Sequence, residues 1–373
     1  MKRLLYLLFA AVAVTACAPA VPAGEFLIAG KIENVPDSAV VFLYEMRGRI
    51  LQEIAVDTLV DGKFSFRDTV AFPKRVLLYA EGEGYPNWLF EVWVAPGKRV
   101  NVKGRDKMIG LWDVSSEIPE QQEENAYLVR VVPEMREMML LMADAPEEPF
   151  SNRKDSLYKG LLSRITAKTV CYMQTAPVTT VWINKLVEYA GSLQYGIGTG
   201  CKAEMLALYD RMSAEQRQSQ KGQLIDACLN PPPAIGIGDE MVDGDLYDVD
   251  GNRHRLSEFA GKYLLLDFWS AGCGPCVQAI PELKEIGERY KDRVEVVSIS
   301  QDPEREWKEF VAGRQLTGNQ WNQLLEGNIG LGASYRVKGI PHFVLIAPDG
   351  RVQDIWVGYG KGSLLEKIAE NIK

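Results

Sequence analysis

Two cysteines that stand two residues apart form the most reactive pattern in the chain. Cys273 and Cys276 follow an apolar run at 263–269 and begin a segment, 274–291, whose apolar residues have helical spacing. At the start of a helix the first sulfur lies beside unpaired backbone N–H groups and the positive end of the helix dipole, which lowers its pKa. We therefore expect Cys273 to attack disulfides as a thiolate and Cys276 to be the resolving thiol.

Two other roles for this pair fit the sequence less well. Half of a zinc ribbon needs a second Cys or His pair, and the chain holds only two histidines and no such pair nearby. A structural disulfide would close a loop of two residues, which adds little stability by the chain-entropy argument. The pattern favours a redox-active Cys273–Cys276 disulfide with no metal and no further cofactor.

One carboxyl interrupts the apolar run before the cysteines. Asp267 stands between Leu266 and Phe268. Burial of a carboxyl is costly unless the group is paired or used. We expect Asp267 to lie beneath the cysteines and to relay the proton of Cys276, which must ionise to resolve a mixed disulfide. An edge position or a structural Asp satisfied by water is the alternative.

The elements around these residues alternate between strand and helix from Ala234 onward, which is typical of an α/β sheet. A first hairpin turns at Asp250-Gly251. We expect strands at 263–269, 294–300, near 323–325, 342–347 and 351–356, and helices at 274–291, 303–314 and 364–372. Pro341 precedes the strand at 342–347, where it removes a ladder hydrogen bond, so a special turn with a cis peptide is expected.

Residues 236–373 resemble the TlpA/ResA-like thiol–disulfide oxidoreductases of the thioredoxin superfamily. The motifs that carry the resemblance are Asp267-Phe268-Trp269, Cys273-Gly274-Pro275-Cys276, Pro281, Gly339-Ile340-Pro341 and Ala347-Pro348-Asp349-Gly350. The resemblance implies a thioredoxin-like fold, protein dithiol or disulfide substrates, and an electron donor in the membrane or envelope. It also implies that Pro341 is cis and lies against the disulfide, while the backbone of Ile340 pairs with a substrate strand. The implied substrate-binding residues are Trp269, Gly274, Pro275, Ile340, Pro341 and His342.

The chain departs from the family pattern at two positions. Gly272 stands where an aromatic residue usually precedes the first cysteine, which changes the apolar lip offered to a substrate. His342 follows the expected cis-proline, where small or hydroxylic residues are common. Its ring either faces the dithiol and stabilises the thiolate when protonated, or is simply that of a strand residue.

The start of the chain has the pattern of an export signal. Residues 1–17 have a basic beginning, an apolar core at 4–14 and a small-residue exit before Cys17. The ending Val14-Thr15-Ala16-Cys17 resembles a bacterial lipobox, in which Cys17 becomes the lipidated residue; an ordinary cleaved signal is the alternative. Two or three acyl chains would anchor the protein to a bilayer. Residues 18–24 then form a tether without an acidic run, which favours a periplasm-facing envelope location.

Two further segments precede the redox unit, which we place at 234–373. Residues 25–110 hold short β-rich runs separated by turns, so an antiparallel sandwich or barrel of about seven strands is expected. Residues 115–230 are expected to be helical, with helices at 120–142, 151–175, 178–194, 201–212 and 214–229. The upstream order is similar to that of bacterial envelope lipoproteins, whose β domain has no settled function. A stiff run of prolines at 231–233 ends the helical segment.

Three cysteines lie in the helical segment. If the last two helices are antiparallel, Cys201 and Cys228 lie at the same end, and we expect a disulfide between them in an oxidising compartment. Cys171 would then be a buried free thiol.

Composition excludes some functions. The chain carries 50 acidic and 42 basic side chains, a net charge of −8, and has no dense basic stripe, so it is not a nucleic-acid binder. Its 373 residues predict two to three domains. We expect a membrane-anchored enzyme that exchanges disulfides with envelope proteins, with the reductase direction favoured. The alternatives are a non-enzymatic adaptor and a peroxiredoxin-like peroxidase, although the Pro and Thr/Ser that precede a peroxidatic cysteine are missing.

Overall fold

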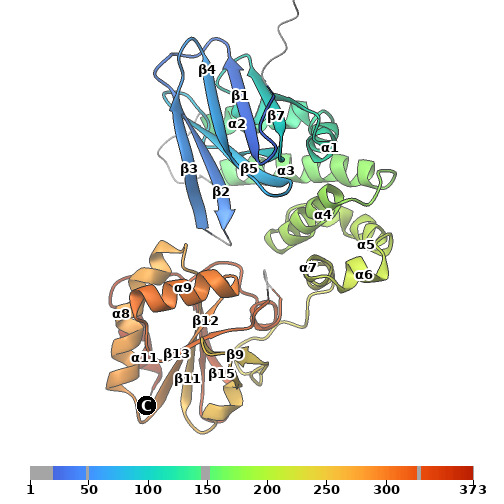
Figure 1. Ribbon diagram of the computed structural model, residues 1–373. Helices are drawn as coiled ribbons and strands as arrows, with labels where there is room; N and C mark the ends of the chain where they lie inside the picture. The colour runs from blue at the N-terminus through green and yellow to red at the C-terminus, as the bar shows by residue number, and fades with distance from the viewer. Residues whose placement is uncertain (1–19, 48–49, 144–151, 326–328, 373) are drawn as a thin grey trace, which may run out of the picture.

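The computed structural model describes residues 20–372, apart from 48–49, 144–151 and 326–328 (Figure 1). The predicted signal segment and Cys17 lie outside the described residues. Blue strands form one end of the molecule in Figure 1, the orange sheet forms the other, and green helices lie beside them. Within the described stretches, no helix combines the length and the apolar character needed to cross a bilayer.

The first part of the chain forms eight strands in two sheets. Their bounds are β1 Glu25–Ile32, β2 Val40–Arg47, β3 Ile50–Thr58, β4 Lys63–Thr69, β5 Lys74–Glu81, β6 Phe90–Val94, β7 Lys98–Gly104 and β8 Asp113–Ser116. One sheet has the order β4-β1-β7-β8 and the other β3-β2-β5-β6. Alternate residues of β1 are buried, and Phe26 and Ile28 share a core with Val41 and Leu43 of β2 in the second sheet. Two sheets on one core correspond to the sandwich alternative.

The expectation of a wholly antiparallel arrangement is wrong at one pair. Strand β7 runs parallel to β1, whereas the other strand pairs of the two sheets are antiparallel. The chain leaves the first sheet to build the second and returns beside β1 in the same direction. Strand β3 was not expected from the sequence, because it is mostly exposed and does not alternate clearly between buried and exposed residues.

In the described residues, seven α-helices follow these sheets. Their bounds are α1 Pro119–Leu128, α2 Val132–Ala143, α3 Asn152–Met173, α4 Thr180–Ser192, α5 Lys202–Asp210, α6 Ala214–Gln218 and α7 Gln220–Leu229. The helix expected at 120–142 is split into α1 and α2, and the helix expected at 214–229 is split into α6 and α7. The second break lies at Ser219, whose hydroxyl accepts the backbone N–H of Gly222 and so caps α7. Trp182 and Met205 pack in the same core as Phe26, so residues 20–229 form one unit, here called the N-terminal body.

The last part of the chain is a seven-stranded sheet with the order β10-β9-β13-β12-β11-β14-β15. The strand bounds are β9 Leu246–Tyr247, β10 Arg253–His254, β11 Tyr263–Trp269, β12 Val294–Ser300, β13 Asn319–Asn322, β14 His342–Ile346 and β15 Val352–Val357. The helices are α8 Gly274–Arg289, α9 Glu304–Arg314, α10 Leu331–Ser334 and α11 Ser363–Asn371. The α/β fold implied by the resemblance is confirmed, although the weak strand expected near 323–325 lies earlier, as β13.

The two faces of this sheet bury different parts of the chain. Leu265 and Phe343 point to the face covered by α8 and α11. Leu266 and Val344 point to the opposite face, where Tyr335 packs. Strand β11 is central, with β12 parallel on one side and β14 antiparallel on the other. Its carboxyl end therefore delivers the chain directly to the start of α8.

Candidate active site

The two cysteines meet at the beginning of α8. Cys273 is the N-cap residue, and the backbone N–H of Cys276 donates to its sulfur at 3.2 Å. The two sulfurs are joined at 2.07 Å, so the structure holds the oxidised form. Pro275 lies in the first turn, where its missing N–H costs no helical hydrogen bond. Cys273 is partly exposed and Cys276 is buried, which matches an attacking and a resolving sulfur.

The proline loop lies against the disulfide. The Ile340–Pro341 peptide is cis, as expected. The carbonyl oxygen of Ile340 is 3.6 Å from the sulfur of Cys273. Pro341 is buried, whereas Gly339 is exposed. Together with the exposed Gly274 and Pro275, this loop leaves one side of the disulfide open to a substrate.

Asp267 lies on the α8 side of β11, the side on which Trp269 packs with Cys276. Only 3% of its surface is exposed, and burial raises the pKa of its carboxyl to about 7, against the opposing effect of a hydrogen bond from Ser298. Its Oδ1 has no protein partner among the described residues. Asp267 lines a cavity of about 470 Å³ between α8, β12 and the segment that follows α9. Because β11 is central, the alternative of an edge position is excluded.

Trp269 is placed differently from the expectation. It was assigned to the substrate-binding face, but its side chain is 2% exposed. It packs with Cys276 and Trp307, and its ring centroid is 5.5 Å from that of Phe310. The alternation of β11 puts Trp269 on the same side as Asp267, beneath the dithiol. Trp269 therefore supports the cysteines from inside the domain.

His342 does not face the dithiol. Its side chain lies on the Val344 face of β14, across the sheet from α8, and its ring meets Phe268 edge-on at 5.9 Å. The residue is 4% exposed, and burial lowers the pKa of its ring to about 4. Burial favours the neutral ring, and the position of His342 across the sheet from α8 fits a buried strand residue rather than a group that stabilises the Cys273 thiolate.

A second buried carboxyl beside the site was missed in the sequence. Asp302, 2% exposed, follows β12 and accepts a hydrogen bond from the Ser270 hydroxyl at 2.6 Å. It also accepts the backbone N–H of Ala271 at 2.7 Å. Ser270 and Ala271 belong to the turn that leads into Cys273. An Asp directly before a proline and a helix was the only local sign, and it resembles an ordinary capping residue.

The expected disulfide between Cys201 and Cys228 is not formed. The structure holds both as free thiols, half-buried beside the core of the N-terminal body. Burial raises the pKa of both thiols, and the Glu204 carboxylate adds to the effect at Cys201. Cys228 lines a cavity of about 340 Å³ that also reaches Arg336, and Cys201 does not line it. Cys171 is exposed, contrary to the expectation of a buried thiol.

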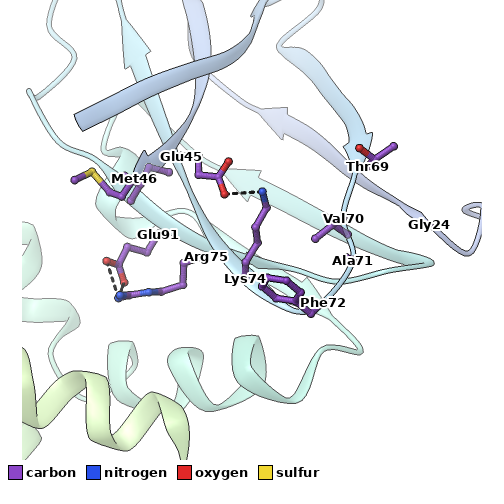
Figure 2. A pocket seen from close by; sticks show the side chains of 11 residues that line it. Gly24, Glu45, Met46, Thr69, Val70, Ala71, Phe72, Lys74, Arg75 and Glu91 are labelled. Carbon is purple, nitrogen blue, oxygen red and sulfur yellow. Dashed lines mark hydrogen bonds and ion pairs between the residues drawn. The ribbon is translucent and has the colours of Figure 1, made fainter. Parts of the chain in front are cut away.

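A cavity of about 720 Å³ lies far from this chemistry, in the β-rich part of the N-terminal body (Figure 2). Its charged lining residues are held in two ion pairs, Lys74–Glu45 at 2.7 Å and Arg75–Glu91 at 3.0 Å. The exposed ring of Phe72 lies beside them. None of its lining residues is a thiol. Across the described residues, no three His, Cys, Asp or Glu side chains are grouped to hold a metal ion.

Comparison with known proteins agrees with this geometry. The family model described as thioredoxin-like matches residues 261–352. The thiol-disulfide oxidoreductase ResA of Geobacillus kaustophilus is 30% identical over 146 residues, which cover 38% of this chain and 80% of that protein. The thioredoxin-like protein YneN of Bacillus subtilis is 29% identical over 130 residues, which cover 33% of this chain and 74% of that protein.

Among solved structures, the thioredoxin domain of a thiol-disulfide oxidoreductase from Bacteroides vulgatus is 27% identical, with a TM-score of 0.34. The match covers 38% of this chain and 100% of that one. The ResA match covers 80% of that protein, and the family-model match at 261–352 spans the dithiol, its helix and the cis-proline loop. The chain therefore belongs to the ResA-like thiol–disulfide oxidoreductases of the thioredoxin family.

Proposed function

We propose that the protein is a membrane-anchored reductase of disulfides in cell-envelope proteins. The observation that carries the proposal is the position of the Cys273 sulfur. It receives the N–H of Cys276 from one side and lies against the cis-proline loop on another. Exposed glycine and proline residues leave the remaining side open. A folded or unfolded polypeptide disulfide can reach this sulfur, whereas the sulfur of Cys276 is too deeply buried to make the first attack.

The exchange begins from the reduced protein. The Cys273 thiolate attacks one sulfur of the substrate disulfide, which forms the Cys273–substrate bond, and the other substrate sulfur leaves and takes a proton. Cys276 then loses its proton and attacks Cys273, which releases the second substrate thiol. Two electrons pass to the substrate, and the protein is left with the Cys273–Cys276 disulfide. A dithiol donor in the envelope must return these electrons.

Asp267 is proposed to take the proton of Cys276. The carboxyl is on the face of β11 where Trp269 packs with Cys276, its Oδ1 is free of protein partners in the described part of the chain, and it borders a cavity. A pKa of about 7 suits a group that must both accept and release a proton near neutral pH. The cavity gives water access to Asp267 while a substrate covers the open side of the disulfide.

The location and direction rest on the sequence. A lipobox ending at Cys17 supports a lipid anchor, and the tether at 18–24 supports a periplasm-facing orientation. Glycine and proline between the two cysteines support the reductase direction. Envelope proteins with disulfides are the proposed substrates, and nucleic acid is not a proposed partner.

Insulin reduction with a small dithiol as electron source tests the activity. Wild type is expected to accelerate the reaction, and Cys273→Ser and Cys276→Ser are each expected to remove the acceleration.

Equilibration with glutathione tests the direction, since a reductase should have a midpoint potential below about −200 mV. Membrane fractionation tests the anchor, because Cys17→Ala should release the protein from the membrane fraction. A wild type that does not reduce insulin, or Cys273→Ser and Cys276→Ser variants that reduce it as fast as wild type, would contradict the proposal.

A further inference from the structure

Asp302 is a buried carboxyl whose partners all lie around the active-site turn or next to it. Its Oδ1 accepts the Ser270 hydroxyl at 2.6 Å. Its Oδ2 accepts the backbone N–H of Ala271 at 2.7 Å and the Ser300 hydroxyl at 3.1 Å. Both oxygens act only as acceptors, which is the hydrogen-bonding pattern of a carboxylate. Every side-chain partner recorded in the described part of the chain is a neutral donor.

These bonds connect Asp302 to Cys273 through one short turn. Ser270 uses its hydroxyl to donate to Asp302 and to accept the backbone N–H of Gly272 at 3.3 Å. The carbonyl of Ser270 accepts the backbone N–H of Cys273 at 3.0 Å. The turn is thus held by Asp302 on one side and continues into α8 on the other. The turn before Cys273 therefore lies between the Asp302 carboxylate and the positive N-terminal end of the α8 dipole.

We propose that Asp302 is a positioning residue that sets the redox poise of the dithiol by opposing the charge of the Cys273 thiolate. The inference rests on the proposed role of Cys273 as the attacking thiolate. A like charge held in a poorly solvated site disfavours ionisation of its neighbour. Less thiolate means a less stable reduced form, and a protein with a less stable reduced form is a stronger reductant. The carboxylate therefore offsets part of the stabilisation that the helix start provides.

Other ionisable groups around the cysteines are placed differently. Asp267 lies on the α8 side of β11 and lines a cavity with residues of α8 and β12. His342 lies on the opposite face of the sheet and is neutral. On α9, Glu306 is paired with Arg305 at 2.9 Å. Asp302 is the carboxylate that bonds directly to the turn before Cys273, so its charge should have the clearest effect on that sulfur.

Asp302→Asn keeps the shape of the side chain and removes its charge. The pKa of Cys273, followed by the ultraviolet absorbance of the thiolate in the reduced protein, is expected to fall by about one unit. The equilibrium with glutathione is expected to shift up to about tenfold toward the reduced protein, which corresponds to about 30 mV for a two-electron couple. A folded Asp302→Asn protein with the wild-type pKa and potential would overturn the proposal.

Ser300→Ala is the second variant, and it separates charge from positioning. The Ser300 hydroxyl donates to the Asp302 carboxylate and accepts the backbone N–H of Asp302, but in the described residues it makes no hydrogen bond to Ser270 or Ala271. Its removal keeps the bonds from Asp302 to the turn and leaves the carboxylate with one donor fewer. The pKa of Cys273 is expected to rise, opposite to the effect of Asp302→Asn. If Asp302→Asn does not fold, as judged by circular dichroism, an unchanged pKa in Ser300→Ala overturns the proposal. Wild-type activity on insulin is measured in parallel, because an inert wild type refutes the proposed function instead.

Discussion

Two helices of this protein begin with a cysteine, and only one of them forms a redox site. Cys201 is the N-cap of α5 in the N-terminal body, and Cys273 is the N-cap of α8. The Cys201 side chain receives no capping hydrogen bond, whereas the Cys273 sulfur receives the N–H of Cys276. The first turn of α5 contains Glu204, and the first turn of α8 contains no acidic residue. Burial and Glu204 raise the pKa of Cys201.

This comparison shows that a position at the start of a helix does not by itself make a cysteine a reactive thiolate. The sulfur must accept an N–H group, the first turn must lack a carboxylate, and a second thiol must lie within bonding distance. Cys201 meets none of these conditions in the structure, and Cys273 meets all of them. The environment, rather than the residue type, separates a bystander cysteine from a redox centre.

The largest expected effect is the loss of activity on removal of one sulfur. Cys273→Ser should abolish insulin reduction, because the remaining active-site thiol, Cys276, is buried and none of the other cysteines in the described residues has a second thiol within bonding distance. Cys201→Ser is the matched control and should keep wild-type activity, since it also removes an N-cap thiol. Measured rates of insulin reduction decide the outcome. A loss of activity in Cys201→Ser would break the comparison.

Asp267 should lower the stability of the oxidised protein at neutral pH and above. Its pKa is raised from 3.8 to about 7, so the folded state binds a proton that the unfolded state lacks between these values. The stabilising contribution is complete below pH 3.8, is lost as pH rises to about 7, and then stays constant. Asp267→Asn should therefore be more stable than wild type by roughly 4 kcal/mol above neutral pH, and by much less in acid.

Urea unfolding of both oxidised proteins across this pH range measures the effect. Asp302→Asn is a useful control, because Asp302 has three donors and Asp267 Oδ1 has none in the described part of the chain. Asp302→Asn should have a lower free energy of unfolding than wild type, because the turn before Cys273 would lose a hydrogen-bond acceptor. A pH-independent difference between wild type and Asp267→Asn would show that the carboxyl is not the titrating group.

Proton transfer by Asp267 predicts a smaller kinetic effect. Asp267→Asn should slow the resolution of the mixed disulfide by about 100-fold near neutral pH, because Cys276 loses its proton acceptor. The initial attack by Cys273 should change little. Stopped-flow measurement of the two steps separates them, and the defect should shrink as rising pH ionises Cys276 without assistance. Equal slowing of both steps would indicate a structural role only.

The smallest effect sharpens the comparison between the two helix starts. Glu204→Gln removes the carboxylate from the first turn of α5, so the pKa of Cys201 should fall by less than about one unit. Its alkylation should become a few times faster at near-neutral pH. Exposed Cys171 serves as the internal reference, and its rate should not change. Mass spectrometry of the alkylated peptides gives both rates. An unchanged Cys201 rate would mean that burial alone raises the pKa of Cys201.

Local sequence patterns were sufficient to predict the central elements of the redox unit. The apolar run at 263–269, broken only by Asp267, predicted β11 at its observed bounds, and the proline before His342 predicted the cis peptide. The paired cysteines predicted their own disulfide. These features depend on neighbours in the chain. Local patterns predict less reliably on which side of the sheet a side chain lies and what it contacts there, as for Trp269 and His342.

Contacts between distant residues explain the rest. Asp302 meets Ser270 and Ala271 only because β11 and β12 are adjacent and parallel, which no local pattern reveals. Strand β3 lacks the alternation that marks a half-buried strand. Proximity of helix ends suggested the Cys201–Cys228 disulfide, but proximity does not fix the direction of a side chain.

The mixed disulfide tests the proposed division of labour between the two cysteines most directly. Cys276→Ser leaves Cys273 able to attack but unable to be released, so covalent complexes with substrate proteins should accumulate in cells. Peptide mapping of these complexes should find every link at Cys273 and none at Cys171, Cys201 or Cys228. Links through one of these other cysteines, or no complexes from a protein whose wild type is also inert toward insulin, would contradict the assignment.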